Sequence, residues 1–166
     1  MIYIRPADMD DLNRLMDIYQ YATRLMATTG NTQQWINGYP SRQLIEHDIE
    51  EGHCYVCITP TEHIVGVFSF IKGEDPTYQH IEGRWLDNSS YATVHRLATS
   101  GEEKGVADAC FRWCLAHADN IRIDTHHDNT VMQHILRKYG FEYCGIIYTA
   151  NGSPRLAFQR KGGTIN

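Results

Sequence analysis

Apolar residues recur at three- and four-residue spacing in four segments of the chain, which is the pattern of helices with one buried face. The first segment follows Asp8, a residue that can cap a helix, and ends at Gly30 at the latest. The second opens at Ser41 and closes before Gly52. The four predicted helices lie within residues 8–30, 41–52, 105–117 and 129–139.

Short runs of Val, Ile, Phe and Tyr, bounded by turn-forming residues, predict strands between and after these helices. Asn151-Gly152 is the strongest hairpin signal in the chain and joins the last two strands. Residues 72–90 contain scattered Gly, Pro, Asp and Asn, so a long loop is expected there. The predicted strands are 2–5, 54–59, 64–71, 91–99, 120–125, 143–149 and 155–159.

The order of these elements predicts a mixed α+β fold with helices on both faces of one sheet. The segment between strands 91–99 and 120–125 contains a helix and fits a crossover, so these two strands are expected to be parallel. We expect a single domain over residues 1–160, followed by a loose tail at 161–166.

Composition excludes several classes of protein. The 166 residues are 42% hydrophobic and carry a net charge of −5, which is typical of a folded domain rather than a disordered chain. There is no apolar run of membrane-spanning length and no clustered Lys and Arg, so neither a membrane nor nucleic acid is an expected partner. A cytoplasmic protein is the expectation, and the sequence leaves the oligomeric state open, a homodimer included.

The five cysteines do not indicate a metal site. Cys54 and Cys57 form a C-x-x-C on a predicted strand, where residues three apart point to opposite faces and cannot share one ion. Cys110 and Cys114 share one face of a predicted helix, where packing accounts for them. We therefore expect free thiols and no metal.

The stretch 97–107 carries the clearest chemical signal. A strand enters a turn containing Gly101 and Gly105 and leads directly into a helix, whose first backbone N–H groups lack partners within the helix. Such a turn can bind phosphate or diphosphate, and Lys104 adds a cation, but an ordinary strand-to-helix turn has the same pattern. Neither a P-loop nor a dinucleotide-binding glycine motif is present. Glu102 and Glu103 would repel an anion, so they are expected to point outward.

In this context the chain resembles the GCN5-related N-acetyltransferases. Their [Q/R]-x-x-G-x-[G/A] loop corresponds to residues 102–107 here, with Gly105 and Ala107 in place and Glu102 where Gln or Arg is usual. Asn129 opens a helix that ends at Gly140-Phe141, as the family's spacing requires. The order of elements matches from residue 2 to residue 160.

The resemblance implies a largely antiparallel sheet of about seven strands, splayed between the fourth and fifth, with acetyl-CoA in the opening. Backbone groups at the end of strand 91–99 would contact the pantetheine arm, the following turn would surround the diphosphate, and Asn129 would bond the pantetheine or sulfur end. The implied cofactor residues are Leu97, Ala98, Thr99, Glu102, Glu103, Lys104, Gly105, Val106, Ala107 and Asn129.

One position departs from the family pattern. Many members carry, five residues before the Phe of Gly-Phe, a Tyr that protonates the leaving thiolate, but Leu136 stands there in this chain. Tyr139 is nearly a full turn further along and aligned with the core stripe. Either another group donates the proton or none is needed, since a thiolate with a pKa of about 8.5 is a tolerable leaving group.

Attack of an amine on a thioester needs a base, because a free alkylamine has a pKa of about 10 and arrives protonated. His95 is the first candidate, since it lies on the strand before the cofactor loop and is expected to share a face with Thr93, Leu97 and Thr99. A half-buried structural histidine is the alternative. A backbone N–H of Leu97 or Ala98 could stabilise the developing oxyanion.

The remaining polar groups can be interpreted without a catalytic role. His126-His127-Asp128 resembles a fragment of a metal site or triad, but a loop in which Asp128 or Asn129 caps the next helix accounts for it. Cys144 on a late strand is expected to be a packed thiol.

Two loops are expected to select the acceptor. Residues 31–40 carry Trp35 and Tyr39, and residues 72–90 carry Trp85. Trp35 has a second interpretation, as a plug between the first two helices. The sequence thus predicts an acetyl-CoA-dependent N-acetyltransferase acting on a primary amine of a small molecule or peptide. A non-catalytic acyl-CoA-binding module and an O-acyltransferase remain as alternatives.

Overall fold

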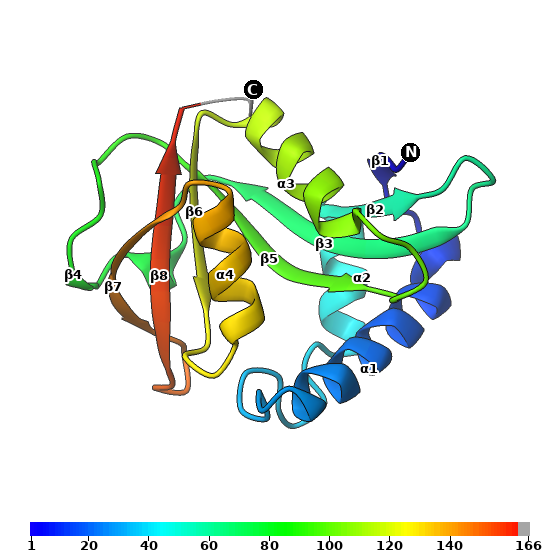
Figure 1. The fold of residues 1–166 in the computed structure, drawn as a ribbon, viewed down its shortest axis with the longest axis horizontal. Helices are drawn as coiled ribbons and strands as arrows, with labels where there is room; N and C mark the ends of the chain where they lie inside the picture. The colour runs from blue at the N-terminus through cyan, green and yellow to red at the C-terminus, as the bar shows by residue number, and fades with distance from the viewer. Residues whose placement is uncertain (163–166) are drawn as a thin grey trace.

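The computed structural model describes residues 1–162, which form one eight-stranded sheet with helices on both faces (Figure 1). The strands occur in the order β1-β2-β3-β5-β6-β8-β7-β4. Their bounds are β1 Tyr3–Pro6, β2 Cys54–Ile58, β3 Ile64–Lys72, β4 Glu82–Gly83, β5 Ala92–Thr99, β6 Asn120–Thr125, β7 Glu142–Tyr148 and β8 Pro154–Lys161. The helices are α1 Leu12–Thr28, α2 Arg42–Glu50, α3 Val106–His117 and α4 Thr130–Lys138, with 3-10 turns η1 at Met9–Asp11 and η2 at Pro76–Tyr78.

The predicted fold class is confirmed: the sheet is mixed and largely antiparallel, and β5 and β6 form its parallel pair. The long loop expected over residues 72–90 is interrupted by two short elements that the sequence did not predict. That segment contains η2 and the short strand β4, which pairs with β7 at the edge of the sheet. The sequence gives no signal for β4, because it has two residues and its pairing depends on a close approach of Gly83 to Gly145.

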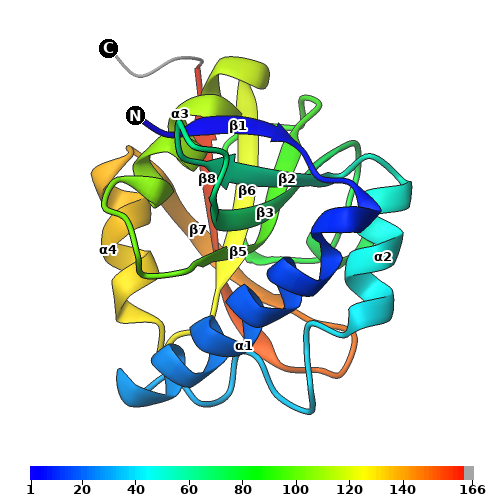
Figure 2. The ribbon, with the colours of Figure 1, turned by 90° about the vertical axis from the view of Figure 1, so that its right-hand side faces the viewer.

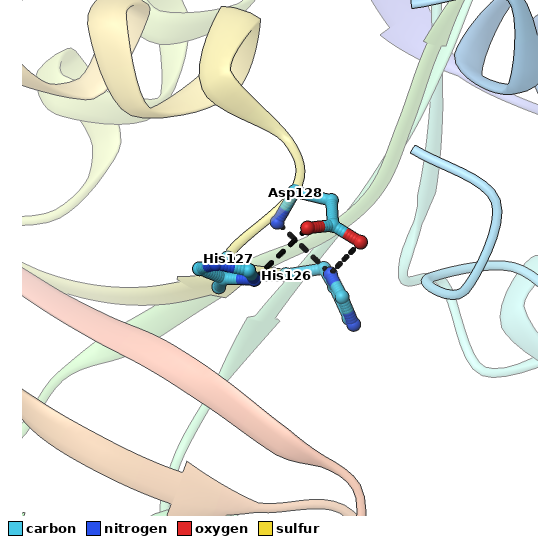
Figure 3. Close-up of side chains that lie close together, drawn as sticks. All are labelled: His126, His127 and Asp128. Atoms are coloured by element: carbon cyan, nitrogen blue, oxygen red, sulfur yellow. Dashed lines mark hydrogen bonds and ion pairs between the residues drawn. The ribbon is translucent and has the colours of Figure 1, made fainter. Parts of the chain in front are cut away.

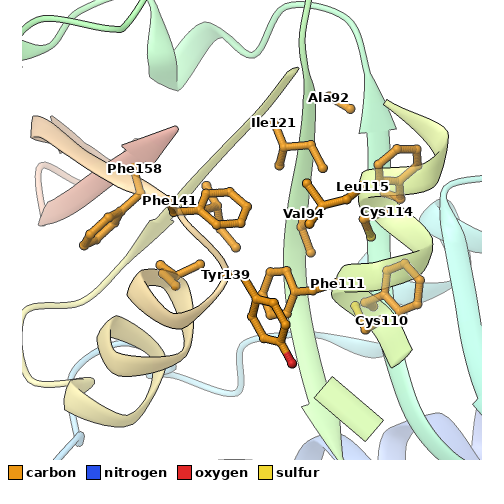
Figure 4. Close-up of a cluster of buried hydrophobic side chains, with 14 of the residues drawn as sticks. Ala92, Val94, Cys110, Phe111, Cys114, Leu115, Ile121, Tyr139, Phe141 and Phe158 are labelled. Carbon is orange, nitrogen blue, oxygen red and sulfur yellow. The ribbon is translucent and has the colours of Figure 1, made fainter. Parts of the chain in front are cut away.

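The helices cover the two faces of the sheet in pairs, α1 with α2 and α3 with α4 (Figure 2). Each face has its own apolar core. The larger core lies under α3 and α4 and includes Phe111 and Phe158 (Figure 4). Leu136 of α4 belongs to the same core. The other lies under α1 and α2, around Leu15 and Ile45. Both helix pairs therefore lie against the sheet on their apolar stripes, as the spacing of these residues predicts.

The β2 cysteines divide between the two cores, Cys54 under α1 and α2 and Cys57 under α3 and α4. This is the alternation expected of a strand, and it keeps the two thiols on opposite faces of the sheet. Within residues 1–162 the five cysteines are buried free thiols, Cys110, Cys114 and Cys144 among them. Burial raises the pKa of the Cys57 thiol to about 12, so this group is inert at neutral pH.

The parallel pair β5 and β6 stays together for a very short distance. Ala92 pairs with Ile121 and Thr93 pairs with Arg122, after which the two strands diverge (Figure 1). The β6-facing edge of β5 beyond Thr93 has no ladder partner among the described strands. Backbone groups of β5 are therefore open to a ligand in the splay, as at any unpaired strand edge.

A bulge in β5 changes which residues share a face. On β3, Val67 pairs with Ala98 and Ser69 with His95, so Arg96 and Leu97 lie opposite the single residue Phe68. Arg96 has a φ of 53° at this point, in the left-handed region.

Because of this bulge, the expectation that His95, Leu97 and Thr99 continue one alternating face is wrong. Leu97 packs against the core under α3 and α4, whereas the ring of His95 lies beside Tyr78 in a different cluster. A one-residue insertion reverses the alternation beyond it, and simple period-two counting cannot detect it.

The predicted tail begins inside a strand. Lys161 is the last residue of β8 and pairs with Asn120, and the Gly162 N–H donates to the Asp119 carbonyl at 2.7 Å. Residues 163–166 of the predicted tail lie outside the described residues. Across residues 1–162 the structure contains no helix of the length and apolarity needed to cross a bilayer.

Candidate active site

A cleft of about 730 Å³ lies where β5 and β6 diverge. Its walls come from the carboxyl end of α1, the loop after it, β5, the start of α4 and the β7–β8 hairpin. Seven residues singled out from the sequence line it: Trp35, Tyr39, His95, Leu97, Thr99, Ala107 and Asn129. The structure thus brings candidates from both predicted roles, cofactor and acceptor, into one cavity of the size that binds small molecules.

The bend between β5 and α3 presents free backbone amides. Gly101 and Gly105 have φ values of 78° and 80°, and Gly105 is the residue that precedes α3. The N–H groups of residues 103–108 donate to no other group within residues 1–162. Because Thr99 and Ala107 on either side of the bend line the cleft, these amides and the positive end of α3 lie at its edge.

Glu102 is turned away from the bend by two partners. Its carboxylate forms an ion pair with Arg14 of α1 and a hydrogen bond with His63, whose Nε2 is 3.2 Å from Oε2. Hydrogen bonds with Ser100, Arg14 and His63 lower the pKa of Glu102 to about 2, so it is ionised at neutral pH. The Arg14 guanidinium balances its charge, which removes the conflict between an acidic residue and an anion on the bend. Glu103 and Lys104 are exposed.

Close packing fixes the start of α3 against the sheet. A Cβ added at Gly66 of β3 would lie 2.5 Å from Cγ1 of Val106, the first residue of α3. Val106 is buried, so the helix begins in direct contact with β3. The position of the free amides therefore depends on the absence of a side chain at residue 66.

Asn129 caps α4 and ties it to the loop after α1. Its Oδ1 accepts from the Met132 N–H at 3.0 Å, and its Nδ2 donates to Oε1 of Gln34 at 2.9 Å. The cap expected from the sequence is confirmed. Gln34 also accepts from Asn31 and Thr125, so one side-chain amide connects the loop, the end of β6 and the start of α4 across the splay.

His95 forms a hydrogen-bonded pair with Asp75, the residue that caps η2. His95 Nε2 lies 3.0 Å from Asp75 Oδ2, and both residues line the cleft. The Asp75 carboxylate also accepts from the Thr77 N–H at 2.9 Å, which fixes its position. The hydrogen bond from His95 lowers the pKa of Asp75 despite its burial. When Nε2–H donates to this carboxylate, the lone pair of the imidazole is on Nδ1, and this nitrogen can accept a proton.

The β5 bulge is held by a buried ion pair that the sequence did not reveal. Arg96 donates from Nε and Nη2 to the two oxygens of Asp48 of α2, both at 2.9 Å. Asp48 also accepts from Ser69 at 2.8 Å, and the Arg96 carbonyl accepts from Tyr19 at 2.7 Å. Arg96 further donates to the Tyr39 hydroxyl at 3.1 Å. The hydrogen-bond network around Arg96 therefore connects the bulge in β5 to Tyr39, a predicted acceptor-site residue.

The three aromatic candidates have different surroundings. Trp35 packs edge-on against Tyr19 of α1 and lines the cleft, so it fills the gap beside α1 and forms a wall of the cavity at once. Tyr39 lines the cleft and is partly exposed. Trp85 does not line it: its indole N–H donates to the Tyr78 carbonyl at 2.9 Å and its ring covers Arg122. The structure therefore does not bring Trp85 to the other candidates.

Neither Leu136 nor Tyr139 reaches the cleft. Leu136 is fully buried in the core under α3 and α4. Tyr139 stacks on Phe111 (Figure 4). Its hydroxyl donates to Asp108. Burial and the bond to Asp108 raise the pKa of Tyr139 to about 12. Position 136, where many family members carry a catalytic Tyr, is therefore occupied by a core leucine in this chain.

The cluster His126-His127-Asp128 lies in the turn between β6 and α4 (Figure 3). Its potential ligand atoms lie within 4.8 Å of one another. However, His126 Nδ1 accepts from the Asp128 N–H at 3.0 Å, and His127 Nδ1 lies 2.9 Å from Asp128 Oδ1. These contacts occupy atoms that a metal would need, which agrees with a turn that leads to the Asn129 cap.

Four charged residues of this cavity were not singled out from the sequence: Asp75, Arg96, Asp124 and Arg155. Asp75 lies in a segment expected to be a loop, and Arg155 lies on the edge of a hairpin. A charged residue inside a predicted strand, such as Arg96 between His95 and Leu97, was the one available signal. It indicates a polar partner on the buried face.

Comparisons with known proteins agree with this architecture. The family model described as "Acetyltransferase (GNAT) domain" matches residues 2–142. A GNAT-family acetyltransferase structure from Streptococcus agalactiae is 34% identical, with a TM-score of 0.89 over 98% of this chain and 96% of the other.

More distant structures share the fold. The ribosomal-protein-S18-alanine N-acetyltransferase of Escherichia coli is 12% identical, with a TM-score of 0.64 over 100% of this chain and 97% of the other. The PaiA N-acetyltransferase of Thermoplasma acidophilum, in complex with coenzyme A, is 13% identical, with a TM-score of 0.65 over 97% and 99%. A search of curated proteins found no match. On the family match and the 34% identical structure, the chain belongs to the GNAT family of acetyltransferases.

Proposed function

We propose that this acyltransferase transfers an acetyl group from acetyl-CoA to the primary amine of a small molecule or peptide, by direct attack of the amine on the thioester. The observation that supports this most strongly is the row of free amides at residues 103–108, beside a cleft that opens from the unpaired edge of β5. The likeness to a structure that holds coenzyme A agrees with the choice of carrier.

The residues present fit such a carrier. A diphosphate needs several N–H donors at a positive helix end, and the bend supplies them with Glu102 turned away. Backbone groups of Leu97 and Thr99 on the open edge of β5 suit the amide-bearing pantetheine arm. When bound, acetyl-CoA supplies a thioester carbonyl as the electrophile.

The remaining chemistry falls to side chains of the same cleft. His95 accepts the amine proton at Nδ1, because Asp75 holds Nε2–H and fixes the tautomer. Asp75 orients the imidazole and stabilises it when it becomes charged, without itself taking the proton. A backbone N–H of Leu97 or Ala98, placed by the bulge, stabilises negative charge on the attacked carbonyl oxygen. Tyr39 and Trp35 form the wall that the acceptor meets.

Two measurements test this proposal in sequence. Thermal unfolding is followed with acetyl-CoA, CoA and ATP, and we expect acetyl-CoA and CoA to raise the melting temperature and ATP to have little effect. Thiol release from acetyl-CoA is then measured across a panel of primary amines, with the acetylated product detected by mass spectrometry. No stabilisation by acetyl-CoA would refute the coenzyme assignment. Stabilisation without thiol release across the panel would favour a binding module.

A further inference from the structure

Three arginine side chains within residues 1–162 are largely buried, and two of them have a direct partner that stabilises the charge. Arg96 is paired with the Asp48 carboxylate at both oxygens. Arg122 lies between the rings of Trp85 and Tyr91, at 4.3 and 4.1 Å from their centroids, so π-faces stabilise its charge. A buried guanidinium is expected to have a partner of this kind, because it cannot lose its charge under ordinary conditions.

Arg155 of β8 is the exception. It is 7% exposed, and no carboxylate within residues 1–162 lies within ion-pair distance of it. No ring covers it in the described chain either. Its hydrogen bonds go to neutral oxygens: the Ser153 hydroxyl, the Pro154 carbonyl at 3.0 Å and the Gln34 carbonyl at 3.2 Å. Burial lowers the pKa of Arg155, and the more distant charge of Asp124 offsets this effect only in part.

Arg155 lines the same cleft as the His95–Asp75 pair. Opposite charges lie on different walls of this cleft. Asp124 and Asp75 carry negative charge on the β6 and η2 walls, and Arg155 carries positive charge on β8. Asp124 is held by the Tyr78 hydroxyl at 2.6 Å and forms no ion pair with Arg155. The charge of Arg155 also contributes, after burial, to lowering the pKa of neighbouring His126. Among the described residues that line the cleft, Arg155 is therefore the arginine without a direct ion pair, and an entering anion could bind there.

We propose that Arg155 is the carboxylate-binding residue of the acceptor site, and that the acceptor is an amine that also carries a carboxylate, that is, a compound of the amino-acid class. The planar guanidinium fork suits two carboxylate oxygens. The amine end of the same molecule would be directed toward His95 and the acidic wall formed by Asp75 and Asp124. This inference rests on the proposed acetyl transfer and specifies its substrate class.

The test uses matched pairs of acceptors that differ in one charge. The standard amino acids and β-alanine are each compared with their methyl esters, in thiol release and in thermal shift of the CoA-saturated protein. Charge-assisted hydrogen bonds predict that the best acid exceeds its ester by about 10- to 100-fold in kcat/KM. Arg155→Gln should reduce this acid-to-ester ratio to about one, and Arg155→Lys, which keeps the charge but not the fork, should give an intermediate ratio.

Arg137→Gln is the matched control, because it removes the same charge from an exposed position of α4 that does not line the cleft. Its acid-to-ester ratio should equal that of the wild type. If Arg155→Gln does not fold, the Arg155→Lys ratio and the wild-type shifts with acids and esters decide the question.

Equal response to acids and esters, or an acid preference that survives Arg155→Gln, would overturn the inference. Silence toward every acid in both measurements would overturn it as well. Failure of the proposed function has a different signature, which is no stabilisation by acetyl-CoA and no thiol release with any amine.

Discussion

The two halves of the cleft are built from different parts of the polypeptide. The half that we assign to the coenzyme comes from one continuous stretch, from β5 through the bend into α3, and it offers backbone groups. The half that we assign to the acceptor comes from side chains distant in sequence, among them Tyr39, Asp75, His95 and Arg155. The first half should tolerate changes of side chain as long as the backbone stays in place, whereas the second should not.

The largest effect is expected from His95→Gln, which removes the proposed base without adding charge. General base catalysis contributes roughly 10²- to 10⁴-fold, so we expect turnover to fall by at least about 100-fold. The loss should be greatest at a pH where the imidazole is neutral and the amine still carries its extra proton, and it should shrink at low pH, where a protonated imidazole cannot act as a base. The affinity for CoA should be unchanged. His134→Gln, an exposed position on α4, is the control. A pH–rate profile identical to that of the wild type would remove His95 from the mechanism.

Asp48→Asn should cause the largest loss of stability. It leaves the buried Arg96 guanidinium without its counter-charge, and removing one partner of a buried pair costs about 3–5 kcal/mol. We expect the free energy of unfolding, measured by denaturant titration, to fall by about 3 kcal/mol. The exposed pair of Arg42 and Glu46 provides the contrast, since Glu46→Gln should change it by less than about 0.5 kcal/mol. Equal effects of the two variants would contradict the role of the Arg96 network.

Gly66→Ala tests the coenzyme half through its backbone. The added Cβ collides with Val106 and must displace the first turn of α3, and we expect CoA binding to weaken by about 10-fold, which is about 1.4 kcal/mol. Calorimetric titration with CoA measures the effect. The double variant Gly66→Ala with Val106→Ala removes the colliding Cγ1 and should recover most of the affinity. Unchanged CoA affinity in Gly66→Ala would show that the position of this turn does not matter.

Asp75→Asn should lower turnover about fivefold, because the imidazole loses the carboxylate that fixes its tautomer. It should also change the dependence of stability on pH. The pKa of Asp75 is depressed, chiefly by its hydrogen bond with His95, so its contribution is present above the unfolded value of about 3.9 and is lost as the pH falls through the lower folded value. The stability gap between wild type and variant should therefore close in acid. Glu74→Gln, at the exposed neighbour, should show no such closing gap.

The smallest effect is expected from Lys104→Ala. Lys104 is exposed on the bend, and an exposed charge is screened at physiological ionic strength. CoA affinity should fall by no more than about threefold at 0.15 M salt. A loss as large as that of Gly66→Ala would mean that side chains, and not amides, hold the diphosphate. The contrast between the two halves would then be wrong for the coenzyme.

The contrast between a coenzyme half built from one continuous stretch and an acceptor half built from distant residues also explains which features the sequence could predict. The bend, with Gly101 and Gly105 before an apolar helix, is local and carries its own pattern, so its position and the caps at Ser41 and Asn129 could be predicted. The acceptor half depends on contacts between residues far apart, such as Asp75 with His95, 20 positions away. No local pattern encodes such pairs.

The two clear misses in the fold have the same origin. β4 is too short to have a period and exists because β7 pairs with it. The bulge at Arg96 is stabilised by α2 and Tyr19, which lie 48 and 77 residues away in sequence. In both cases tertiary contacts determine the local conformation, and periodicity within a single strand carries no information about them.

The most direct measurement is a crystal structure of the protein with CoA bound. It places the diphosphate relative to the bend between β5 and α3. The account predicts diphosphate oxygens at about 2.7–3.2 Å from several N–H groups of residues 103–108. A coenzyme bound elsewhere on the molecule, with these amides making no contact to it, would contradict the account.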